Sequence, residues 1–487
     1  MYITALTIGI ALTAAALYQP AKPLPAPSAH IAHQVGLAGD KSTLLPADVA
    51  AILERPELRS ATIGLYAINL KTGLQIIKYN SNRACMPASN QKLLTAAAGL
   101  QLLGGDFTWK TDISQNGTTL HITFDGDPLL TRAQLTSAIA AVKDKLTGQI
   151  SQIAIDDTRI QGDPLGIAWQ WDDIGAGFSA PVGAATIDKN VVKVTVTPPA
   201  SVTNPPRFDV ADGILSIRAN TTISEAGQTN TAAPEAAGRL TITRNPLRPE
   251  VEITGALVAG GKPVTSMVAV DNPTDAAFRI VSSILRESSI PTDPNVQYVR
   301  RPRGAADILL TTIASKPLSQ TLPDFLKPSD NLYGELLLRT IGRLDAGAAT
   351  PAAGIKRLQA WMASNGIPTS GVQPADGSGL SMWNTTTAEA TVALLKMMAA
   401  NKDFRDALPV GGIDGTLKAR FPALDHKGKV QAKTGTLSVA SCLSGYAVTG
   451  TGETIVFSIL MNHFDRKAGS AAARRAQDDI VRYLLSL

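Results

Sequence analysis

Residues 85–103 read CMPASNQKLLTAAAGLQLL, a turn with a proline followed by a run of apolar residues at helical spacing. Pro87 and the small residues after it predict a helix that begins near Ala88 or Ser89. Within this stretch, Ser89-Asn90-Gln91-Lys92 is the only Ser-x-x-Lys sequence of the chain. Residues three apart share one face of a helix, so we expect the lysine amine to lie close to the serine hydroxyl.

This pair is suited to nucleophilic catalysis. A serine hydroxyl needs a base to take its proton, and an ordinary lysine, with a pKa of about 10.4, is protonated at neutral pH. Burial and a second nearby cation would lower the pKa of Lys92 and let its amine accept the proton of Ser89. The helix start adds free N–H groups where an oxyanion would form. A chain of this length contains about one such match by chance, so the motif needs others beside it.

A second motif is Ser329-Asp330-Asn331, which follows Pro328 at the start of an expected helix. Serine and aspartate are also common helix caps, so the motif alone has a purely structural interpretation. In a catalytic site, the Ser329 hydroxyl would relay a proton and the Asn331 amide would hold a substrate carbonyl.

A third motif, Lys433-Thr434-Gly435-Thr436, lies on an expected strand at the edge of a sheet. An edge strand can pair with an extended peptide while the lysine meets the peptide's terminal carboxylate. Two similar sequences, Ser114-Gln115-Asn116 and Lys71-Thr72-Gly73, are interpreted as plain turns.

In the rest of the chain, segments with the residue pattern of helices alternate with segments that have the pattern of strands. Helices are expected at 275–289, 331–344, 352–364, 387–400 and 468–485. Strands are expected at 62–70, 74–79, 121–124, 153–155, 191–196, 240–243, 251–253, 442–448 and 454–461. The segment 199–237, rich in Pro, Thr, Asn and Ala, is expected to contain the likeliest loop. This pattern predicts an α/β fold split by a β-rich insertion.

Ser-x-x-Lys, Ser-Asp-Asn and Lys-Thr-Gly in this order are the signature of class A β-lactamases and penicillin-binding proteins. Ser329 follows Ser89 by 240 residues, which leaves too long an insert for a β-lactamase. The chain therefore resembles the class C low-molecular-mass penicillin-binding proteins, the D-alanyl-D-alanine carboxypeptidase/endopeptidases of peptidase family S13. Four further segments resemble this family: Phe178-Ser179-Ala180-Pro181, Asp376-Gly377-Ser378-Gly379-Leu380-Ser381, Gly412-Ile413-Asp414-Gly415-Thr416-Leu417 and Leu443-Ser444-Gly445-Tyr446.

The resemblance implies a β-lactamase/transpeptidase-like domain, an antiparallel sheet flanked by helices, interrupted by two small inserted domains. The expected division is a leader at 1–30, the first part of the main domain at 31–105, the insertion at 106–272 and the second part at 273–487. These limits mark changes in sequence texture near residues 105 and 272.

The resemblance also implies roles for individual residues. Ser89 matches the acylated nucleophile, Lys92 the general base, and Ser329 the residue that passes a proton to the leaving amine. Asn331 would bind the acyl-side amide carbonyl. The terminal carboxylate would be held by the third motif, through Lys433, Thr434 and Thr436. The backbone N–H groups of Ser89 and Thr436 would form the oxyanion hole.

A pocket for the substrate side chain is implied within the insertion, where Trp171-Asp172-Asp173 precedes Phe178. Asp173 would pair with the free amine of diaminopimelic acid, although a turn carboxylate is an equally good interpretation. Many family members carry an arginine where this chain has Met382, so a polar contact with the far end of that side chain is in question.

The implied function is a serine-type D-Ala-D-Ala carboxypeptidase and D,D-endopeptidase that acts on peptidoglycan stem peptides and is acylated by β-lactams. One alternative is a penicillin- or peptidoglycan-binding protein with negligible turnover. The other is a β-lactamase-like hydrolase, which would need an additional base for its deacylating water, and no motif identifies one.

Composition excludes several other functions. The 45 Lys and Arg and 40 Asp and Glu are dispersed, so the net charge of +5 does not form the basic patch of a nucleic-acid-binding protein. Two cysteines, Cys85 and Cys442, and five histidines without an HExxH pair favour neither a disulfide framework nor a metal site. The two cysteines are interpreted as buried thiols. We expect no cofactor and no metal.

The first 17 residues are apolar or small, and a Pro/Ala-rich segment follows them. This resembles a secretory signal peptide, although no Lys or Arg precedes the apolar run, so a membrane anchor is the alternative. We expect a periplasmic or otherwise extracytoplasmic protein. Its mildly basic charge also suits peripheral association with an anionic membrane or cell wall.

Overall fold

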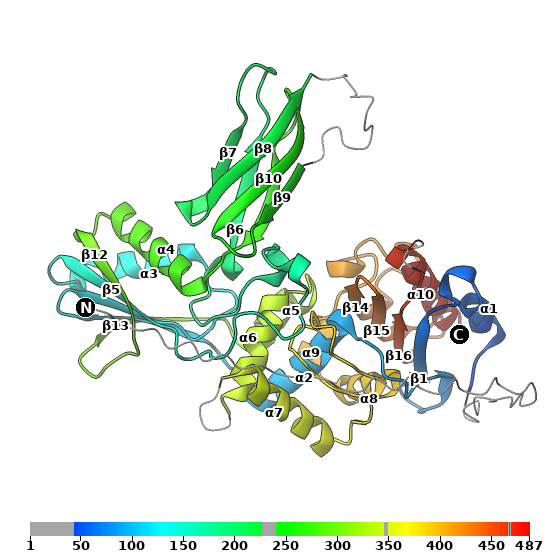
Figure 1. Cartoon of the computed structure of the whole chain (residues 1–487). Coiled ribbons are helices and arrows are strands. Elements are labelled where there is room, and N and C mark those ends of the chain that lie inside the picture. Colours follow the sequence, from blue (N-terminus) through cyan, green and yellow to red (C-terminus); the bar gives the residue numbers. More distant parts are fainter. Residues whose placement is uncertain (1–42, 226–239, 345–348, 466, 468) are drawn as a thin grey trace, which may run out of the picture. The chain divides into compact units, whose positions relative to one another are not determined.

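Five antiparallel strands form the central sheet, in the order β14-β15-β16-β1-β2 (Figure 1). The structure, a computed structural model, describes residues 43–225, 240–344, 349–465, 467 and 469–487, and the expected leader at 1–30 lies outside them. The strands are β1 (Thr62–Asn69), β2 (Gln75–Tyr79), β14 (Val430–Leu437), β15 (Ala440–Val448) and β16 (Thr454–Asn462). Strands from both ends of the chain thus share one sheet, and β14 forms its edge.

Helices cover both faces of this sheet, which confirms the predicted fold class. On one face, α1 (Ala47–Leu53) and α10 (Gly469–Leu485) share a core with strand residues such as Phe457. On the other face, α2 (Gln91–Leu103) and α8 (Ala388–Met398) share a core with Val456. Because helices cover both faces, β15 and β16 are buried along almost their whole length and appear in the sequence as continuous apolar runs.

Helix α2 lies at the centre of the helical layer. Ten of its thirteen residues, from Gln91 to Leu100, are buried, and this includes the charged Lys92. It contacts α8 and four other helices: α5 (Leu318–Leu326), α6 (Asn331–Gly342), α7 (Pro351–Ser364) and α9 (Lys402–Asp406). A helix that is buried on all sides in this way gives a rigid base to the residues at its N-terminus.

A second five-stranded sheet has the order β12-β5-β4-β3-β13 and packs with α3 (Arg132–Ala141) and α4 (Pro273–Glu287). Its strands are β3 (Lys110–Asn116), β4 (Thr119–Thr123), β5 (Ile150–Asp156), β12 (Thr292–Arg300) and β13 (Ile308–Ala314). Two of them, β12 and β13, come from beyond residue 272. The domain limits near 105 and 272 stay a prediction.

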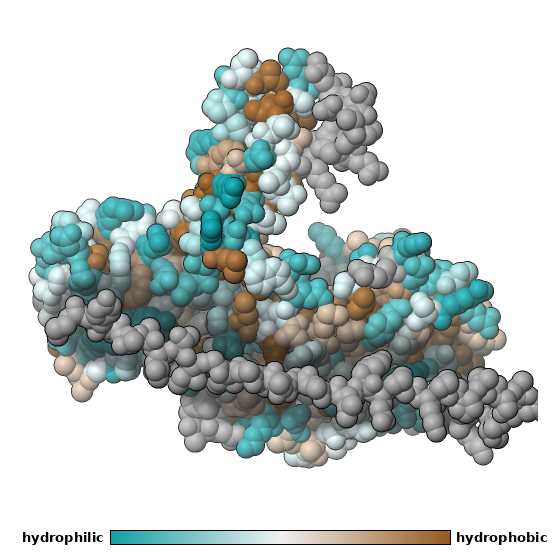
Figure 2. Space-filling model, in the orientation of Figure 1, coloured by the Kyte–Doolittle hydropathy of each residue, from teal (hydrophilic) through white to brown (hydrophobic). Residues whose placement is uncertain are grey.

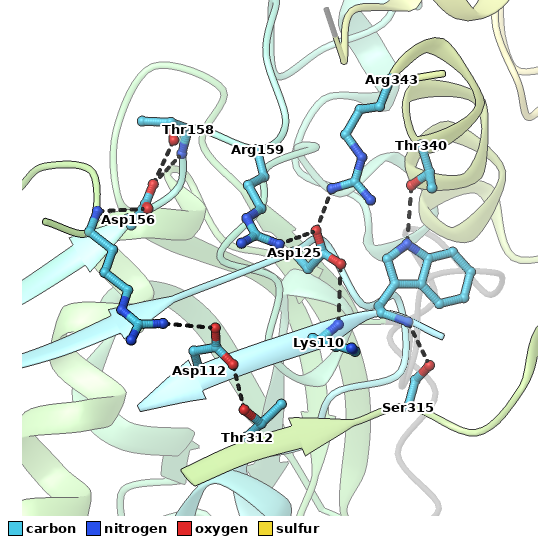
Figure 3. Close-up of polar contacts among 12 residues, drawn as sticks. Lys110, Asp112, Asp125, Asp156, Thr158, Arg159, Thr312, Ser315, Thr340 and Arg343 are labelled. Atoms are coloured by element: carbon cyan, nitrogen blue, oxygen red, sulfur yellow. Dashed lines mark hydrogen bonds and ion pairs between the residues drawn. The ribbon is translucent and has the colours of Figure 1, made fainter. Parts of the chain in front are cut away.

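Polar contacts join this second sheet to the C-terminal half of α6 (Figure 3). Asp125 binds both Arg159 and Arg343, and its other oxygen accepts the backbone N–H of Lys110 at 3.2 Å. The Trp109 indole donates to Thr340 at 3.1 Å, in the same helix. Since α6 begins with Asn331, the insertion is fixed to the helix that carries the second motif.

Two three-stranded sheets, β11-β6-β7 and β8-β10-β9, complete the insertion. Their strands are β6 (Val191–Thr197), β7 (Arg207–Val210), β8 (Ser216–Ser224), β9 (Leu240–Arg244), β10 (Glu250–Val258) and β11 (Val264–Ala269). Figure 2 shows brown apolar groups on the surface of this part of the molecule, where Leu247 is 78% and Met267 47% exposed.

Most expected helices and strands are present, and one interpretation was wrong. Ser114-Gln115-Asn116, predicted as a turn, lies in β3, and the turn follows it at Gly117. The segment 199–237, expected to contain the likeliest loop, also contains β7 and β8, which are stabilised by pairing with β6 and β10, and its residues 226–239 lie outside the described ranges. The predicted turn at Lys71-Thr72-Gly73 is confirmed, as are two buried cysteine thiols, Cys85 and Cys442.

Candidate active site

Ser89 lies on a single 3-10 turn (Ala88–Asn90) directly before α2. Two glycines allow the backbone of other segments to pack tightly against this turn. A Cβ on Gly435 of β14 would lie 2.5 Å from the Pro87 carbonyl oxygen, and a Cβ on Gly379 would lie 1.9 Å from the Ala88 carbonyl oxygen. Asn90 fixes the turn further, since its side chain donates to the Ser444 hydroxyl of β15 at 2.7 Å.

Lys92 is fully buried one turn after Ser89. Its Nζ atom lies 2.9 Å from the Ser89 Oγ, 2.6 Å from the Asn331 Oδ1 and 2.7 Å from the Ser378 carbonyl oxygen. Burial lowers the pKa of Lys92 to about 8, although nearby carboxylates, chiefly Asp376, oppose this shift. An amine with this pKa can act as a base near neutral pH.

The second buried amine, Lys433 of β14, is directed at the second serine. Its Nζ donates to the Ser329 hydroxyl at 2.9 Å and to the Thr434 carbonyl at 2.8 Å. Burial, together with the charge of Lys92, lowers the pKa of Lys433 well below its usual value. Ser329 itself is in the left-handed region, with φ at +66°, directly before α6. Each buried lysine thus has a serine hydroxyl as a hydrogen-bond partner.

The other two residues of the second motif connect the site to the insertion. Asp330 caps α6 by accepting the backbone N–H of Tyr333 at 3.0 Å, and it forms an ion pair with Lys189 at 2.8 Å. The capping interpretation is therefore correct for Asp330. Asn331 accepts from Lys92 and donates through its Nδ2 to the Phe178 carbonyl at 2.8 Å.

The third motif lies along the edge strand β14, as predicted. The Thr434 hydroxyl donates to the Thr416 hydroxyl at 2.8 Å, and Thr436 is exposed. On its free side, an edge strand has backbone N–H and C=O groups that can bind an extended peptide.

A cavity of about 530 Å³ lies in front of these groups. Six of the residues predicted for the site line it: Ser89, Asp173, Phe178, Ser329, Asn331 and Thr436. The two buried lysines do not line it, but they bind residues that do: Lys92 binds Ser89 and Asn331, and Lys433 binds Ser329. Thr434 instead lines an adjoining cavity of about 520 Å³, which shares Thr436 with the first.

One wall of the cavity comes from the insertion, through the 3-10 turns Trp171–Asp173 and Gly177–Ser179. Asp173 is partly buried, and burial together with the neighbouring Asp172 raises the pKa of its carboxyl. Phe178 is 52% exposed at the same wall. Met382 accepts a hydrogen bond from the Gln170 amide, with 2.7 Å between nitrogen and sulfur.

Two buried carboxylates behind the site were not predicted. Glu335, one turn after Asn331 in α6, accepts the backbone N–H groups of Gly377 and Ser378 at 3.1 and 2.9 Å. Asp376 accepts backbone N–H groups from its own loop, and the Trp169 indole of the insertion at 3.1 Å. An acidic residue within the apolar run of α6 was the sequence signal for Glu335. Its partners lie about 40 residues away and were not apparent.

The described residues contain no group of three or more His, Cys, Asp or Glu side chains that could hold a metal ion. They do contain the Ser89 hydroxyl beside the buried Lys92 amine, whose pKa is lowered, and a second amine–hydroxyl pair, Lys433 and Ser329. The edge strand β14 lies beside both pairs. This set suits acyl transfer to a serine.

The sequence model of the D-Ala-D-Ala carboxypeptidase 3 (S13) family matches residues 45–485. A D-alanyl-D-alanine carboxypeptidase from Actinomadura sp. is 31% identical over 451 residues, covering 87% of this chain and 82% of the relative. The D-alanyl-D-alanine carboxypeptidase DacB of Haemophilus influenzae is 27% identical over 435 residues, covering 85% and 88%.

Solved structures agree with these sequence matches. The crystal structure of penicillin binding protein 4 (dacB) from Haemophilus influenzae has a TM-score of 0.78 and 25% identity, and the match covers 90% of this chain and 99% of that one. The fold, the order of the three motifs and the match over nearly the whole described chain lead to one conclusion. The chain belongs to the D-Ala-D-Ala carboxypeptidase 3 (S13) family, a family of serine peptidases.

Proposed function

We propose that this chain hydrolyses the terminal D-Ala-D-Ala bond of peptidoglycan stem peptides through an acyl-enzyme on Ser89, and that it also opens D-alanyl cross-links. The observation that carries the proposal is the distance of 2.9 Å between the Lys92 Nζ and the Ser89 Oγ, in a site where the Lys92 pKa is lowered to about 8. Both groups needed to form the nucleophile are therefore in contact.

In the first step, neutral Lys92 takes the proton of Ser89, and the Oγ attacks the carbonyl carbon of the penultimate D-alanine. The backbone N–H groups of Ser89 and Thr436 stabilise the oxyanion. The C–N bond then breaks, and the proton held by Lys92 reaches the leaving amine through Ser329, which Lys433 orients at 2.9 Å. D-alanine leaves, and the remaining peptide is esterified to Ser89.

In the second step, a water molecule attacks the ester carbonyl while Lys92 accepts a proton from the water. The C–O bond to Ser89 breaks, the Oγ is reprotonated, and the peptide leaves with a new carboxyl group. A cross-linked peptide reacts by the same route. Its leaving group is the amino group on the D-configured carbon of a diamino acid, which takes the place of the D-alanine amino group.

Substrate binding would involve the other predicted residues. The hydroxyls of Thr434 and Thr436, with Lys433 behind them, bind the carboxylate that follows the scissile bond. The Asn331 amide, which donates to the Phe178 carbonyl in this structure, would bind the acyl-side carbonyl instead. The substrate strand would lie along β14.

Asp173 would select the side chain on the acyl side. Among the described residues that line the 530 Å³ cavity it is the only charged one, and Gln170 and Phe178 line the same cavity. A carboxylate without a cation beside it favours a side chain that ends in an amine, as diaminopimelic acid does. Met382 supplies no positive charge for a distal carboxylate on that side chain.

We also propose that the protein acts outside the cytoplasm, at the cell wall, where its substrate lies, with peripheral attachment to the wall or membrane. No helix within the described ranges is long and apolar enough to cross a membrane. The apolar segment at 1–17 would direct export.

The experiment that tests this function is D-alanine release from a diaminopimelate-containing pentapeptide by the purified full chain. Wild type and Ser89→Ala are compared, and both are also tested for labelling by fluorescent penicillin. We expect release and labelling in the wild type and neither in Ser89→Ala. Labelling without release from either pentapeptide or cross-linked dimer would favour a binding protein with negligible turnover.

A further inference from the structure

The cavity of about 520 Å³ beside the catalytic cavity has an unusual lining. It combines hydroxyl groups of β14 and the preceding loop with arginines of that loop and of α10. The residues used here are Thr416, Arg420, Thr434, Thr436, Arg474 and Arg475. Such a lining of hydroxyls and guanidinium groups is suited to carboxylates.

The positive charge of this cavity is not neutralised by its own residues. Asp478, the one acidic residue of the lining, forms an ion pair with Arg420 at 2.6 Å. Arg474 and Arg475 are exposed, and neither forms an ion pair within the described part of the chain. Two guanidinium groups are thus available to a ligand.

The position of the cavity relates it to one side of the scissile bond. Thr436 lines both cavities, and Thr434 lines only the arginine-rich one. In the proposed function these two hydroxyls bind the carboxylate of the residue that leaves. Whatever is attached to that residue therefore continues past Thr434 and Thr436 toward Arg474 and Arg475. D-alanine has only a methyl group there, whereas a cross-linked diamino acid carries the rest of a stem peptide with further carboxylates.

We propose that the arginine-rich cavity is a leaving-group subsite, in which Arg474 and Arg475 bind a carboxylate of the second stem peptide in a D-alanyl cross-link. The inference rests on the proposed function and deepens it: among cross-linked peptides, those with an anionic leaving half are preferred, and Arg474 and Arg475 are the residues that select them. Because α10 is packed against the sheet through Ala473, Ala476 and Ile480, the two arginines are presented from a rigid helix. The subsite therefore favours cross-link cleavage over release of D-alanine.

The test compares kcat/KM of the wild type with that of the double variant Arg474→Gln/Arg475→Gln on two substrates. Both proteins are used as full chains. One is a monomeric pentapeptide, and the other is a cross-linked dimer with free carboxylates in its leaving half. We expect the double variant to lose about tenfold in kcat/KM on the dimer and less than about twofold on the pentapeptide. A dimer whose leaving half is amidated should be cleaved equally by both proteins.

Two controls make the comparison specific. Lys396→Gln/Lys402→Gln removes two positive charges from exposed positions on α8 and α9 and should behave as wild type on both substrates. The rate of penicillin acylation should be unchanged in the arginine variant, which shows that the catalytic site is intact.

Three results would overturn the inference while the proposed D-Ala-D-Ala carboxypeptidase activity stands. They are an equal loss on both substrates, no loss on the dimer, and a wild type that releases D-alanine from the pentapeptide but does not cleave the dimer. A wild type that cleaves neither substrate would contradict the proposed function itself, and the inference with it.

Discussion

Glu335 and Lys92, two fully buried charged residues, bind the same backbone residue, Ser378. The Glu335 carboxylate accepts the Ser378 N–H at 2.9 Å, and the Lys92 ammonium donates to the Ser378 carbonyl at 2.7 Å. The charge of Glu335 raises the pKa of Lys92, against the larger lowering by burial. Burial and the neighbouring Asp376 raise the pKa of Glu335 to about 7. Glu335 therefore helps to position the general base proposed here and, together with Asp376 and Asp330, opposes the lowering of its pKa by burial.

The first prediction concerns pH. Only neutral Lys92 can accept the Ser89 proton, so the rate of penicillin acylation should rise with pH and level off above a midpoint near the Lys92 pKa of about 8. Glu335→Gln keeps an oxygen for the two backbone N–H groups but removes a negative charge that stabilises the ammonium. Its midpoint should therefore lie at lower pH than that of wild type.

This is measured as the second-order rate constant of benzylpenicillin acylation between pH 5 and 10. The control is Glu287→Gln, at an exposed position at the end of α4, and it should keep the wild-type midpoint. A Glu335→Gln midpoint that is unchanged or higher would show that Glu335 does not act on Lys92 through its charge.

The second prediction concerns Lys92 itself. Lys92→Met replaces the amine with an apolar side chain of similar length, so the buried site keeps its packing but loses its base. Acylation should fall by about 10²–10⁴-fold, and a cooperative thermal unfolding transition should show that the variant is folded. Lys396→Met on α8 is the matched exposed control. Retention of wild-type acylation in Lys92→Met would exclude Lys92 as the base.

The third prediction concerns the contact between β14 and the turn that carries Ser89. A Cβ added at Gly435 would lie 2.5 Å from the Pro87 oxygen and 3.1 Å from the Ser89 nitrogen. Gly435→Ala should therefore separate strand and turn, slow acylation about 10²-fold and destabilise the fold by about 1–3 kcal/mol.

Gly450→Ala is the control for this change, because a Cβ there meets only the Leu485 carbonyl oxygen, at 3.9 Å. Acylation kinetics and thermal unfolding are measured on both variants. If the two variants are acylated at the same rate, the close contact between Gly435 and the turn is not needed to position Ser89 for acylation.

The fourth prediction concerns side-chain selection on the acyl side. Wild type should prefer a pentapeptide with a free side-chain amine over the same peptide with that amine acetylated. Asp173→Asn removes the negative charge and should reduce this preference about tenfold in kcat/KM, mainly through the free-amine substrate. D-alanine release from both peptides is the measurement. An unchanged preference would support the interpretation of Asp173 as a turn carboxylate.

The sequence was most informative where local pattern and structure agree. Pro87, the apolar run after it and the strand texture of β15 and β16 each determine their own element, so helix and strand positions could be predicted. The three motifs could be located because each lies at the end or edge of such an element. That the three motifs meet at one cavity was expected only from the resemblance to the family. Local sequence patterns do not predict it, because it depends on contacts between segments far apart in the chain.

What could not be predicted depends on such distant contacts. Strand β3 is polar and lacks strand texture at Ser114-Gln115-Asn116, and it forms because β4 and β13 pair with it on either side. The partners of Glu335 are backbone groups of another loop, and Arg474 and Thr434 line one cavity because α10 packs against β15, the neighbour of β14. No local pattern encodes these relationships.

The most direct measurement is intact-protein and peptide mass spectrometry of the full chain quenched during turnover of a pentapeptide, and separately after exposure to benzylpenicillin. The account predicts an ester on Ser89 in both cases: the peptide without its last D-alanine, and the opened penicillin. Ser89→Ala should carry neither. An adduct on any other residue, or D-alanine release that persists in Ser89→Ala, would contradict the claim that Ser89 is the nucleophile.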